Sequence, residues 1–405
     1  SMKIVQINET CGTGSIGRTT SEFAEACSKL GHDSYVFYAS GTPAYKKSYQ
    51  IGNSFYQKAH AVWSRVTGEQ GYASYIPTIQ LLKKLDEIEP DIVHLRNLHA
   101  NYINLGMLLK YLARKNIATV ITLHDCWFFT GKCTYYVPAN CQKWQDNCGE
   151  CPLLHKDNVN PTLWFDRTSK CLNDKRKWFS AIPRLAVVGV SNWVASEASK
   201  SFLGNRNPIG IYNWIDSEVF QPRETSDLRK ELNLEDKFVV LMVTTGISEK
   251  KGYLVLKALS EMLSSDYQLI VVGKNPLNLE IPKNVIHIHH TNDAVELSKY
   301  YSMADVCVNT TKFETFGKVT AEALCCGTPV IVYNNTASPE LVGPGCGYVV
   351  DENAGFEAVA EAVNKIRKTG KEAMTSDCLK FAREQFSKEN GVHRYMDLYE
   401  ALLKK

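Results

Sequence analysis

Residues 314–324 read E-T-F-G-K-V-T-A-E-A-L, shortly after an apolar segment, Val306–Asn309, that predicts a buried strand. The stretch places two carboxylates eight positions apart. Glu314 falls in the loop before a predicted helix, and Glu322 lies about a turn and a half inside that helix. We therefore expect both side chains to reach one ligand. The start of the helix offers unpaired backbone amides, which suit a phosphate group, at Phe316, Gly317 and Lys318.

The whole chain has the composition of an ordinary globular protein. Its 405 residues exceed the roughly 250–300 that one hydrophobic core accommodates, so we expect two domains. With 44% apolar and 22% charged residues, dominant disorder is excluded. No apolar run approaches the roughly 18–20 residues of a membrane-spanning helix. A formal net charge of +3 does not suggest a nucleic-acid-binding protein.

Strand and helix patterns alternate along the chain, restart once, and predict the α/β class with parallel sheets covered on both faces. The first apolar strand is Lys3–Asn8, and the rhythm restarts at Phe238–Val243. The polar stretch 216–236 separates the two halves. We predict an N-terminal domain 1–216, a C-terminal domain 217–385 and a last helix in 386–405 that packs back on the N-terminal domain. A ligand is expected at the carboxyl ends of the strands.

A glycine-rich loop, Gly12–Gly17, matches the pattern G-x-G-x-x-G. NAD binding is one interpretation, but Glu9-Thr10-Cys11 separate the glycines from the predicted strand, and Asp33 stands at the wrong end of the second strand for a ribose contact. Glycines before a helix that begins near Thr19 also suit a bound anion, with Gly14 and Arg18 as candidates. A flexible turn is the remaining interpretation.

The stretch 314–324 resembles the signature E-x-F-G-x-x-x-x-E-A of the retaining GT-B glycosyltransferases of family 4. Four other segments resemble family elements in the same order: Pro90-Asp91-Ile92-Val93-His94, Thr122-Leu123-His124-Asp125, Asn213-Trp214-Ile215-Asp216 and Lys250-Lys251-Gly252. The resemblance covers nearly the whole chain. It implies two Rossmann-like domains, a nucleoside diphosphate sugar on the C-terminal domain and an acceptor on the N-terminal one.

The resemblance also implies roles for individual residues. His124, Lys251 and Glu314 would be catalytic: Lys251 would contact the diphosphate, Glu314 the sugar hydroxyls, and His124 would lie over the sugar. Glu322 would hold the ribose. Further donor-binding candidates are Gly14, Arg18, Thr315, Phe316, Gly317 and Lys318. The family's arginine before the lysine is missing in Thr245-Gly246-Ile247-Ser248, so Lys318 or Arg18 would replace it. No D-x-D or H-E-x-x-H motif occurs, and no cofactor is expected for catalysis.

Four cysteines, Cys133, Cys141, Cys148 and Cys151, share the loop 128–154. Their thiolates would suit a tetrahedral structural zinc ion, with His155 as a substitute ligand. A loop of this length without a staple is unusual in a compact domain. Reduced thiols and disulfides are the alternatives. The cluster also resembles a subgroup of the same family that carries H-D-C-W-x-F-T-G-x-C and further cysteines. A metal here would brace the wall beside His124 and do no chemistry.

Basic and aromatic residues interleave in 160–184, around Trp164, Phe165, Trp178 and Phe179, and again in 44–65. Binding to an anionic membrane is one interpretation. Nucleic acid is a second, which the balanced charge disfavours, and aromatic packing into the core is a third. We expect a cytoplasmic protein, peripheral on the inner face of the membrane if the first interpretation holds.

Together these patterns predict a retaining glycosyltransferase. It would move a sugar from a nucleoside diphosphate sugar to a glycan or lipid-linked glycan. The alternatives are another nucleotide-sugar enzyme of similar fold, such as an epimerase or hydrolase, and a non-catalytic module that binds sugar or senses redox state through the cysteine loop. The two glutamates, Lys251 and His124 argue against the last.

Overall fold

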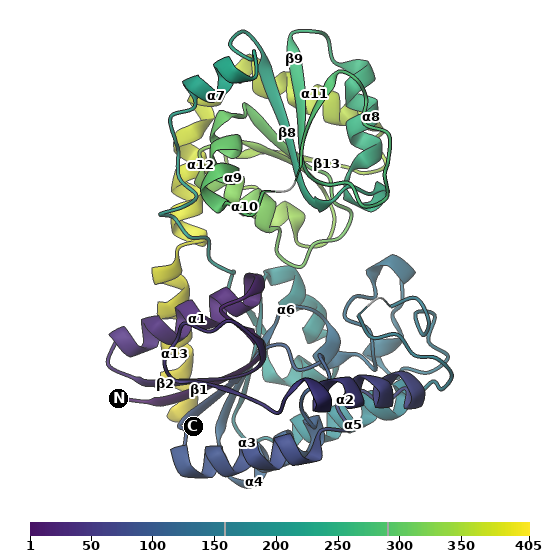
Figure 1. The fold of residues 1–405 in the computed structure, drawn as a ribbon, viewed down its shortest axis with the longest axis vertical. Helices are drawn as coiled ribbons and strands as arrows, with labels where there is room; N and C mark the ends of the chain where they lie inside the picture. The colour runs from purple at the N-terminus through teal and green to yellow at the C-terminus, as the bar shows by residue number, and fades with distance from the viewer. Residues whose placement is uncertain (158, 290) are drawn as a thin grey trace. The chain divides into compact units, whose positions relative to one another are not determined.

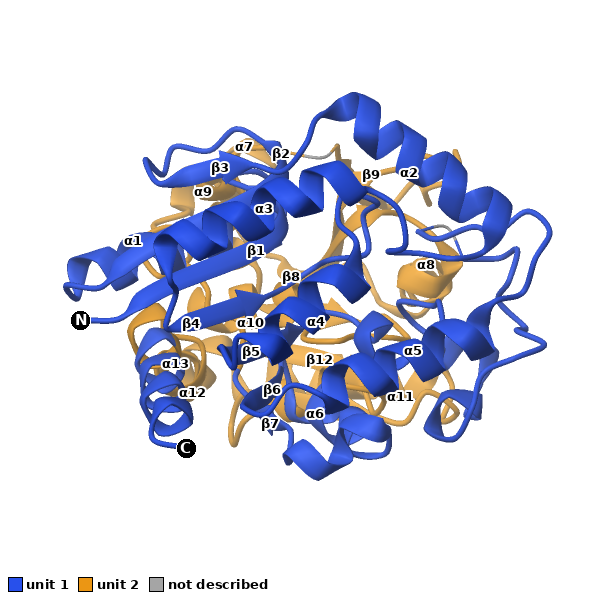
Figure 2. Cartoon of the chain, turned by 90° about the horizontal axis from the view of Figure 1, so that it is seen from below, with its two compact units in different colours: residues 1–211, 392–405 blue, residues 212–391 orange. Residues whose placement is uncertain are grey.

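The computed structural model describes residues 1–157, 159–289 and 291–405. The chain divides into two compact units, coloured separately in Figure 2. Unit 1 comprises residues 1–211 and 392–405, and unit 2 comprises residues 212–391. The first boundary therefore lies shortly before the predicted position of 216, and the return to unit 1 begins at Val392, inside the last helix, and not at 386.

Unit 1 is built on a seven-stranded parallel sheet of order β3-β2-β1-β4-β5-β6-β7. Its strands are β1 (Lys3–Cys11), β2 (Asp33–Gly41), β3 (Ser48–Gln50), β4 (Ile92–Leu95), β5 (Ala118–Leu123), β6 (Leu185–Gly189) and β7 (Ile209–Gly210). Its helices are α1 (Gly14–Lys29), α2 (Ser54–Thr67), α3 (Tyr75–Ile88), α4 (Leu105–Arg114), α5 (Thr168–Ser180) and α6 (Asn192–Ser199). The strand order reverses between β1 and β4, which puts the expected binding crevice at their carboxyl ends.

The last helix, α13 (Lys388–Leu403), completes unit 1 with its residues from Val392 onward (Figure 1). Its Tyr395 and Tyr399 rings pack against Phe23 of α1, with centroid separations of 5.4 and 6.1 Å. Their hydroxyls hydrogen-bond to Thr122 and to buried His94 of the sheet. The C-terminal residues thus supply both apolar cover and polar partners for the centre of this sheet.

Unit 2 holds a six-stranded parallel sheet of order β10-β9-β8-β11-β12-β13. Its strands are β8 (Phe238–Gly246), β9 (Tyr267–Lys274), β10 (Val285–Ile288), β11 (Val306–Asn309), β12 (Val330–Tyr333) and β13 (Gly347–Val350). Its helices are α7 (Ser226–Glu231), α8 (Tyr253–Met262), α9 (Ala294–Met303), α10 (Lys318–Cys325), α11 (Phe356–Thr369) and α12 (Lys371–Gln385).

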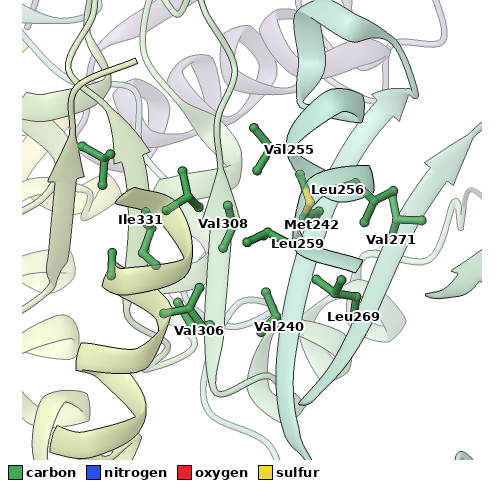
Figure 3. Packing of buried hydrophobic residues seen from close by; sticks show 14 of the residues in the cluster. Val240, Met242, Val255, Leu256, Leu259, Leu269, Val271, Val306, Val308 and Ile331 are labelled. Carbon is green, nitrogen blue, oxygen red and sulfur yellow. The ribbon is translucent and has the colours of Figure 1, made fainter. Parts of the chain in front are cut away.

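Helices cover both faces of this sheet, because successive side chains of each strand point to opposite faces and are buried on both. Figure 3 shows one face, where alternate strand residues pack against α8: Val240, Met242, Leu269, Val271, Val306 and Val308. The residues between them, Val239, Leu241, Ile270 and Cys307, are buried as well. Because side chains alternate across a strand, a strand buried on both faces reads as a continuous apolar run.

Two sequence-based expectations about unit 1 are wrong. The helix expected from Thr19 begins at Gly14, and β1 extends to Cys11, so the glycine-rich loop does follow directly on its strand. The helices α2 and α5 were not expected from the sequence. The inner face of α2 buries only polar residues, His60 and Ser64, and that of α5 mixes polar with apolar ones, so no clean apolar stripe marks either helix.

None of the described helices is both long and apolar enough to cross a membrane.

Candidate functional site

Unit 2 carries its candidate site where the strand order reverses, between β8 and β11. A small cavity lies at the carboxyl ends of these strands, lined by Met242, Thr244, Ile247, Lys251, Gly252, Val308, Asn309 and Thr310. Gly252 has φ 91°, and a Cβ there would meet the methyl of Met242 at 2.9 Å and Thr310 at 3.0 Å. The tight turn after Lys251 therefore needs glycine. In open α/β sheets such a switch point is where ligands bind.

Lys251 and Glu314 come from different loops to this end of the sheet. The exposed Lys251 Nζ donates a hydrogen bond to Thr245 Oγ1 at 2.8 Å. The Glu314 amide donates to Thr336 Oγ1 at 2.8 Å, and its carbonyl accepts from Ala337 at 3.2 Å. Two anchors thus fix the backbone of Glu314, while its carboxyl is left for Asn309 and Lys251.

The carboxyl of Glu314 is not an ordinary surface acid. Burial raises its pKa to about 7, although the hydrogen bond from Asn309 and the charge of Lys251 lower it. Near neutral pH, protonated and ionised forms coexist. An ionised carboxylate accepts hydrogen bonds from hydroxyl groups, whereas the acid also donates one. This group can therefore contact a polyol such as a sugar in a pH-dependent manner.

The start of α10 and Glu322 are the remaining candidates for ligand binding in unit 2. Because α10 begins at Lys318, the predicted amide of Lys318 lies in its first turn, that of Gly317 lies at the N-cap, and that of Phe316 lies before the helix. Gly317, with φ 106°, has no side chain that could cap the first-turn amides. Glu322 is only 3% exposed and accepts a hydrogen bond from the Tyr301 hydroxyl at 3.3 Å.

Thr315, Phe316 and Lys318 take different environments around this turn. Lys318 is exposed and Thr315 half-buried. Phe316 is buried, with its ring centroid 6.1 Å from Tyr212 and 5.7 Å from Phe386. It supports the loop from the core and is not placed to contact a ligand with its side chain.

In unit 1, His124 follows β5 and contacts a buried arginine. Arg96 Nη1 lies 3.3 Å from His124 Nε2, and Arg96 Nε donates to Gln6 Oε1 at 2.9 Å. An arginine cannot accept a hydrogen bond, so His124 Nε2 is the unprotonated nitrogen and Nδ1 carries the proton. Burial first, and then the charge of Arg96, lower the pKa of His124 to about 3. His124 is therefore a neutral hydrogen-bond donor through Nδ1.

The other two histidines near this loop have separate roles. His94 is fully buried, with Tyr399 at 2.5 Å from Nδ1 and Thr122 at 2.6 Å from Nε2, and is structural. His99 Nε2 lies 2.7 Å from Asp125 Oδ2. Burial lowers the pKa of His99, but the Asp125 carboxylate outweighs this and the net shift is upward. Asp125 also accepts the Trp127 amide at 2.9 Å, which fixes the chain after His124.

The glycine-rich loop lies at the carboxyl end of β1. In unit 1 the strand order reverses between β1 and β4, so this loop borders the switch point. Gly14 has φ 71° and opens α1. A Cβ on Gly12 would lie 2.5 Å from the Thr42 carbonyl oxygen, so glycine is required there. Arg18 is exposed, and its Nε donates to the Gly14 carbonyl. Asp33 pairs with Lys47 at the amino end of β2, away from any ribose position of an NAD site.

The four cysteines of loop 128–154 line one cavity of about 20 Å³, enough for a single small occupant. Burial raises the pKa of Cys133 to about 12 and of Cys148 to about 11. In the described ranges, however, no three His, Cys, Asp or Glu side chains are grouped closely enough to hold a metal ion. As arranged, the thiols share a cavity without forming a ligand set.

Buried lysines brace the cysteine loop. Lys175 donates to the carbonyls of Trp127 and Thr130 at 2.7 and 2.8 Å, and Lys132 donates to Leu153 at 3.1 Å. Burial lowers the pKa of Lys175 to about 8. Aromatic rings in mutual contact fill the interior of the loop: Phe129, Tyr136 and Trp144. The structure thus provides staples that sequence reasoning did not anticipate. His155 bonds to the Thr162 carbonyl.

The structure therefore brings Lys251, Glu314 and the start of α10 together in unit 2, while Glu322 is buried inside α10 against Tyr301. In unit 1 it brings His124, Arg96 and Asp125 together. Sequence reasoning assigned no role to Arg96, Asn309 or Thr336. Asn309 ends a buried strand and also donates to Thr320 Oγ1 at 3.0 Å, so it ties β11 to α10. A polar residue at the end of an apolar strand was the available signal.

Two family profiles cover most of the chain. Residues 16–219 match Glycosyltransferase Family 4, and residues 224–385 match the family described as Glycosyl transferases group 1. Because the first match spans just over half of the chain, the protein belongs to Glycosyltransferase Family 4. It is a glycosyltransferase of the GT-B fold, and the family and fold predicted from the sequence are confirmed.

Relatives and solved structures agree with this assignment. The chain is 23% identical to WcaC of Escherichia coli K12, which carries the provisional name of a colanic acid biosynthesis glycosyl transferase, over 77% of each chain. It is 25% identical to N-acetyl-alpha-D-glucosaminyl L-malate synthase of Bacillus anthracis over 54% of this chain and 60% of the relative. The Anabaena protein HepE in complex with UDP superposes with a TM-score of 0.68 at 16% identity, over 99% of this chain and 100% of that one.

Proposed function

We propose that this protein transfers a sugar, with retention of anomeric configuration, from a nucleoside diphosphate sugar to a glycan or lipid-linked glycan. The observation that carries the proposal is the grouping of Lys251, Glu314 and the uncapped start of α10 at the switch point of unit 2. A cation and a helix N-terminus favour a diphosphate, and a carboxyl beside them favours sugar hydroxyls. HepE has been solved with UDP and with UDP-glucose, and WcaC is named for colanic acid biosynthesis, which supports this substrate class.

In the proposed mechanism the protein stabilises the departing diphosphate and positions the sugar. Lys251 and the amides of the first turn of α10 oppose the negative charge that develops as the glycosidic bond to phosphate breaks. A charge-assisted hydrogen bond of this kind contributes about 1.5–3 kcal/mol. Glu314 orients the sugar, and Glu322 holds the ribose. The departing phosphate takes the acceptor proton on the same face, so no carboxylate acts as a covalent nucleophile.

His124 is proposed to donate a hydrogen bond to the transferred sugar through Nδ1. The proposal rests on its neutral state, which follows from burial and from the charge of Arg96, and on its tautomer, which the contact with Arg96 fixes. A neutral donor can contact a hydroxyl without attracting the diphosphate, which a histidinium would do. The other donor-binding residues proposed are Gly14, Arg18, Thr315, Gly317 and Lys318, with Lys318 or Arg18 as the second cation.

Transfer assays with a panel of nucleoside diphosphate sugars and a glycan acceptor test the function. We expect one donor to give product with the anomeric configuration of the donor, measured by proton NMR. Lys251→Met should lose most activity, while Lys274→Met, a lysine at the end of β9, should not. Donor turnover without incorporation would indicate an epimerase or hydrolase instead, and an inverted product would contradict the retaining mechanism.

A further inference from the structure

Unit 1 exposes an unusual concentration of large apolar side chains on α2, the start of α3 and loop 159–165. We call this the α2 surface. Of the 19 large apolar side chains that are exposed in the described residues, ten lie here, with exposed fractions of 43–72%. They are Phe55, Val62, Trp63, Tyr75, Ile76, Ile79, Val159, Leu163, Trp164 and Phe165. Single exposed apolar residues are ordinary, but a cluster of this kind marks an interaction site.

The three segments of the α2 surface are neighbours in space. His60 of α2 lies 2.7 Å from the Ser74 hydroxyl at the start of α3. At the other end of α2, the Leu163 amide donates to the Arg65 carbonyl at 2.9 Å. A Cβ on Gly68 would lie 2.3 Å from the Phe165 carbonyl oxygen, so loop and helix end are in backbone contact. The three segments that carry the exposed apolar side chains are therefore adjacent to one another.

Apolar and basic residues share the outer face of α2. Phe55, Lys58, Val62 and Arg65 recur at intervals of three and four residues and are exposed, whereas His60 and Ser64 point inward and are buried. On α3 the exposed series Ile76 and Ile79 continues into Lys83. An outer helix face normally carries polar residues alone. Here the apolar residues are flanked by cations.

Basic side chains predominate around the α2 surface. In the described ranges, no carboxylate lies within ion-pair distance of Lys58, Arg65, Lys83 or Arg167. The nearby acids are already engaged: Glu69 pairs with Lys170 at 3.0 Å, and Asp166 accepts the amides of Cys151 and Thr168. A partner is therefore expected to be anionic as well as apolar.

We propose that the α2 surface binds an anionic lipid bilayer, with its aromatic side chains at the headgroup level and its lysines and arginines on the lipid phosphates. Tryptophan and tyrosine favour this interface, and basic residues add attraction to anionic lipid. A symmetric pairing of two copies through this surface would bring the same cations together and is disfavoured. Trp178 and Phe179, also basic-flanked in the sequence, are 9% and 0% exposed and belong to the core.

Co-sedimentation of the full chain with lipid vesicles tests this inference. We expect binding to vesicles containing about one-third phosphatidylglycerol at low salt, and much weaker binding at 1 M salt, where the Debye length falls to about 3 Å. The double variant Phe55→Ser with Trp164→Ser should weaken binding at least tenfold. Lys58→Gln with Arg65→Gln should weaken it by about thirtyfold, because each cation near an anionic surface adds about 1 kcal/mol.

The matched control is Leu30→Ser, which alters an equally exposed apolar residue of unit 1, 57% exposed, outside the α2 surface. It should bind like the wild type, and transfer to a water-soluble acceptor should be unchanged in every variant. The inference fails if the wild type does not bind anionic vesicles, or if the control loses as much as the double variant. It also fails if the variants change only self-association, measured by light scattering, because the surface would then join copies of the chain.

Discussion

At the residue scale, the pair Arg96 and His124 links the core of unit 1 to its candidate chemistry. Arg96 is 1% exposed and is held by Gln6 and by the ring of Phe23, whose centroid lies 5.6 Å from its guanidinium carbon. A buried cation is costly unless it has specific partners. Its contact with His124 Nε2 fits a positioning role, in which the arginine selects the tautomer of the histidine.

Replacing Arg96 should therefore alter His124 before it alters the fold. In Arg96→Gln the charge that lowers the pKa of His124 is lost, so this pKa should rise from about 3, and kcat should fall by about tenfold or more if the hydrogen bond of His124 to the sugar is misaligned. Histidine NMR titration measures the first effect, and steady-state kinetics the second. Arg114→Gln, on the surface of α4, is the control. An unchanged His124 titration would contradict the assignment.

The raised pKa of Glu314 gives the activity a predicted pH dependence. Because the ionised form accepts the sugar hydroxyls, kcat/KM for the donor should rise as the pH increases through about 7 and level off above it. In Glu314→Gln this rise should disappear, since the amide does not titrate. The pH profile of kcat/KM for both proteins, at constant ionic strength, is the measurement. A rise that persists in Glu314→Gln would show that another group titrates.

The two glutamates should also separate in their kinetic effects. Glu314→Gln should mainly lower kcat, by roughly 10–100-fold if about 1.5–3 kcal/mol of charged hydrogen bonding is lost, because the geometry of the sugar changes in the transition state. Glu322→Gln should mainly raise the donor KM, since the ribose does not change. Steady-state kinetics and nucleotide binding decide this. A full kcat in Glu314→Gln, or unaltered nucleotide affinity in Glu322→Gln, would contradict these roles.

At the element scale, buried strands were predictable, and surface-covering segments were not. The predicted strand Val306–Asn309 agrees with β11 at both ends, and the predicted strands Lys3–Asn8 and Phe238–Val243 begin where β1 and β8 begin. A strand covered on both faces is apolar throughout and leaves little ambiguity. The exposed residues of α2 include Phe55, Val62 and Trp63, so its pattern does not separate an inner from an outer face. The exposed apolar residues that made this helix hard to predict from the sequence are the same residues on which the lipid proposal rests.

The sequence indicated which residues gather at the candidate site but not their environments. Lys251 and Glu314 could be found because motifs on loops after adjacent parallel strands converge at one sheet edge. The raised pKa of Glu314 depends on burial, which comes from packing and not from spacing. Trp214 stands where the family resemblance expects glycine, and a Cβ on Gly391 of α13 would lie 2.7 Å from its ring. The small residue leaves room for the large ring, and no local sequence pattern predicts such a fit between residues far apart in the sequence.

The cysteine loop yields a prediction about a metal. The sequence predicts a structural zinc ion, and the structure groups the four thiols around one cavity without a ready ligand set in its described residues. If zinc binds, elemental analysis should give about one ion per chain. Cys148→Ser should remove the ion and lower the thermal midpoint of unfolding, and its effect on kcat should be the smaller of the two effects. Cys27→Ser, far outside the loop, should keep the metal. Protein that is folded and fully active after mild purification but contains no zinc would contradict the prediction. The lysine hydrogen bonds and the aromatic packing would then be the only support of the loop.

At the scale of the whole molecule, each unit has its own parallel sheet and its own core, and α13 starts in unit 2 and ends in unit 1. Two large cores predict two calorimetric transitions and not one. A nucleoside diphosphate that binds unit 2 alone should raise only the transition of that unit. At a concentration of about 100 Kd the stabilisation is about 2.7 kcal/mol, which corresponds to roughly 5–10 °C for a unit of this size.

The complementary variant acts on unit 1. Tyr399→Phe leaves the buried Nδ1 of His94 without its partner, which costs about 1–3 kcal/mol, so the transition of unit 1 should fall by several degrees while the nucleotide-sensitive transition stays in place. Tyr49→Phe, an exposed tyrosine of β3, should move neither transition. Differential scanning calorimetry with and without nucleotide distinguishes these outcomes. If Tyr399→Phe and the nucleotide shifted the same single transition, the two units would unfold as one cooperative body, and α13 would couple them.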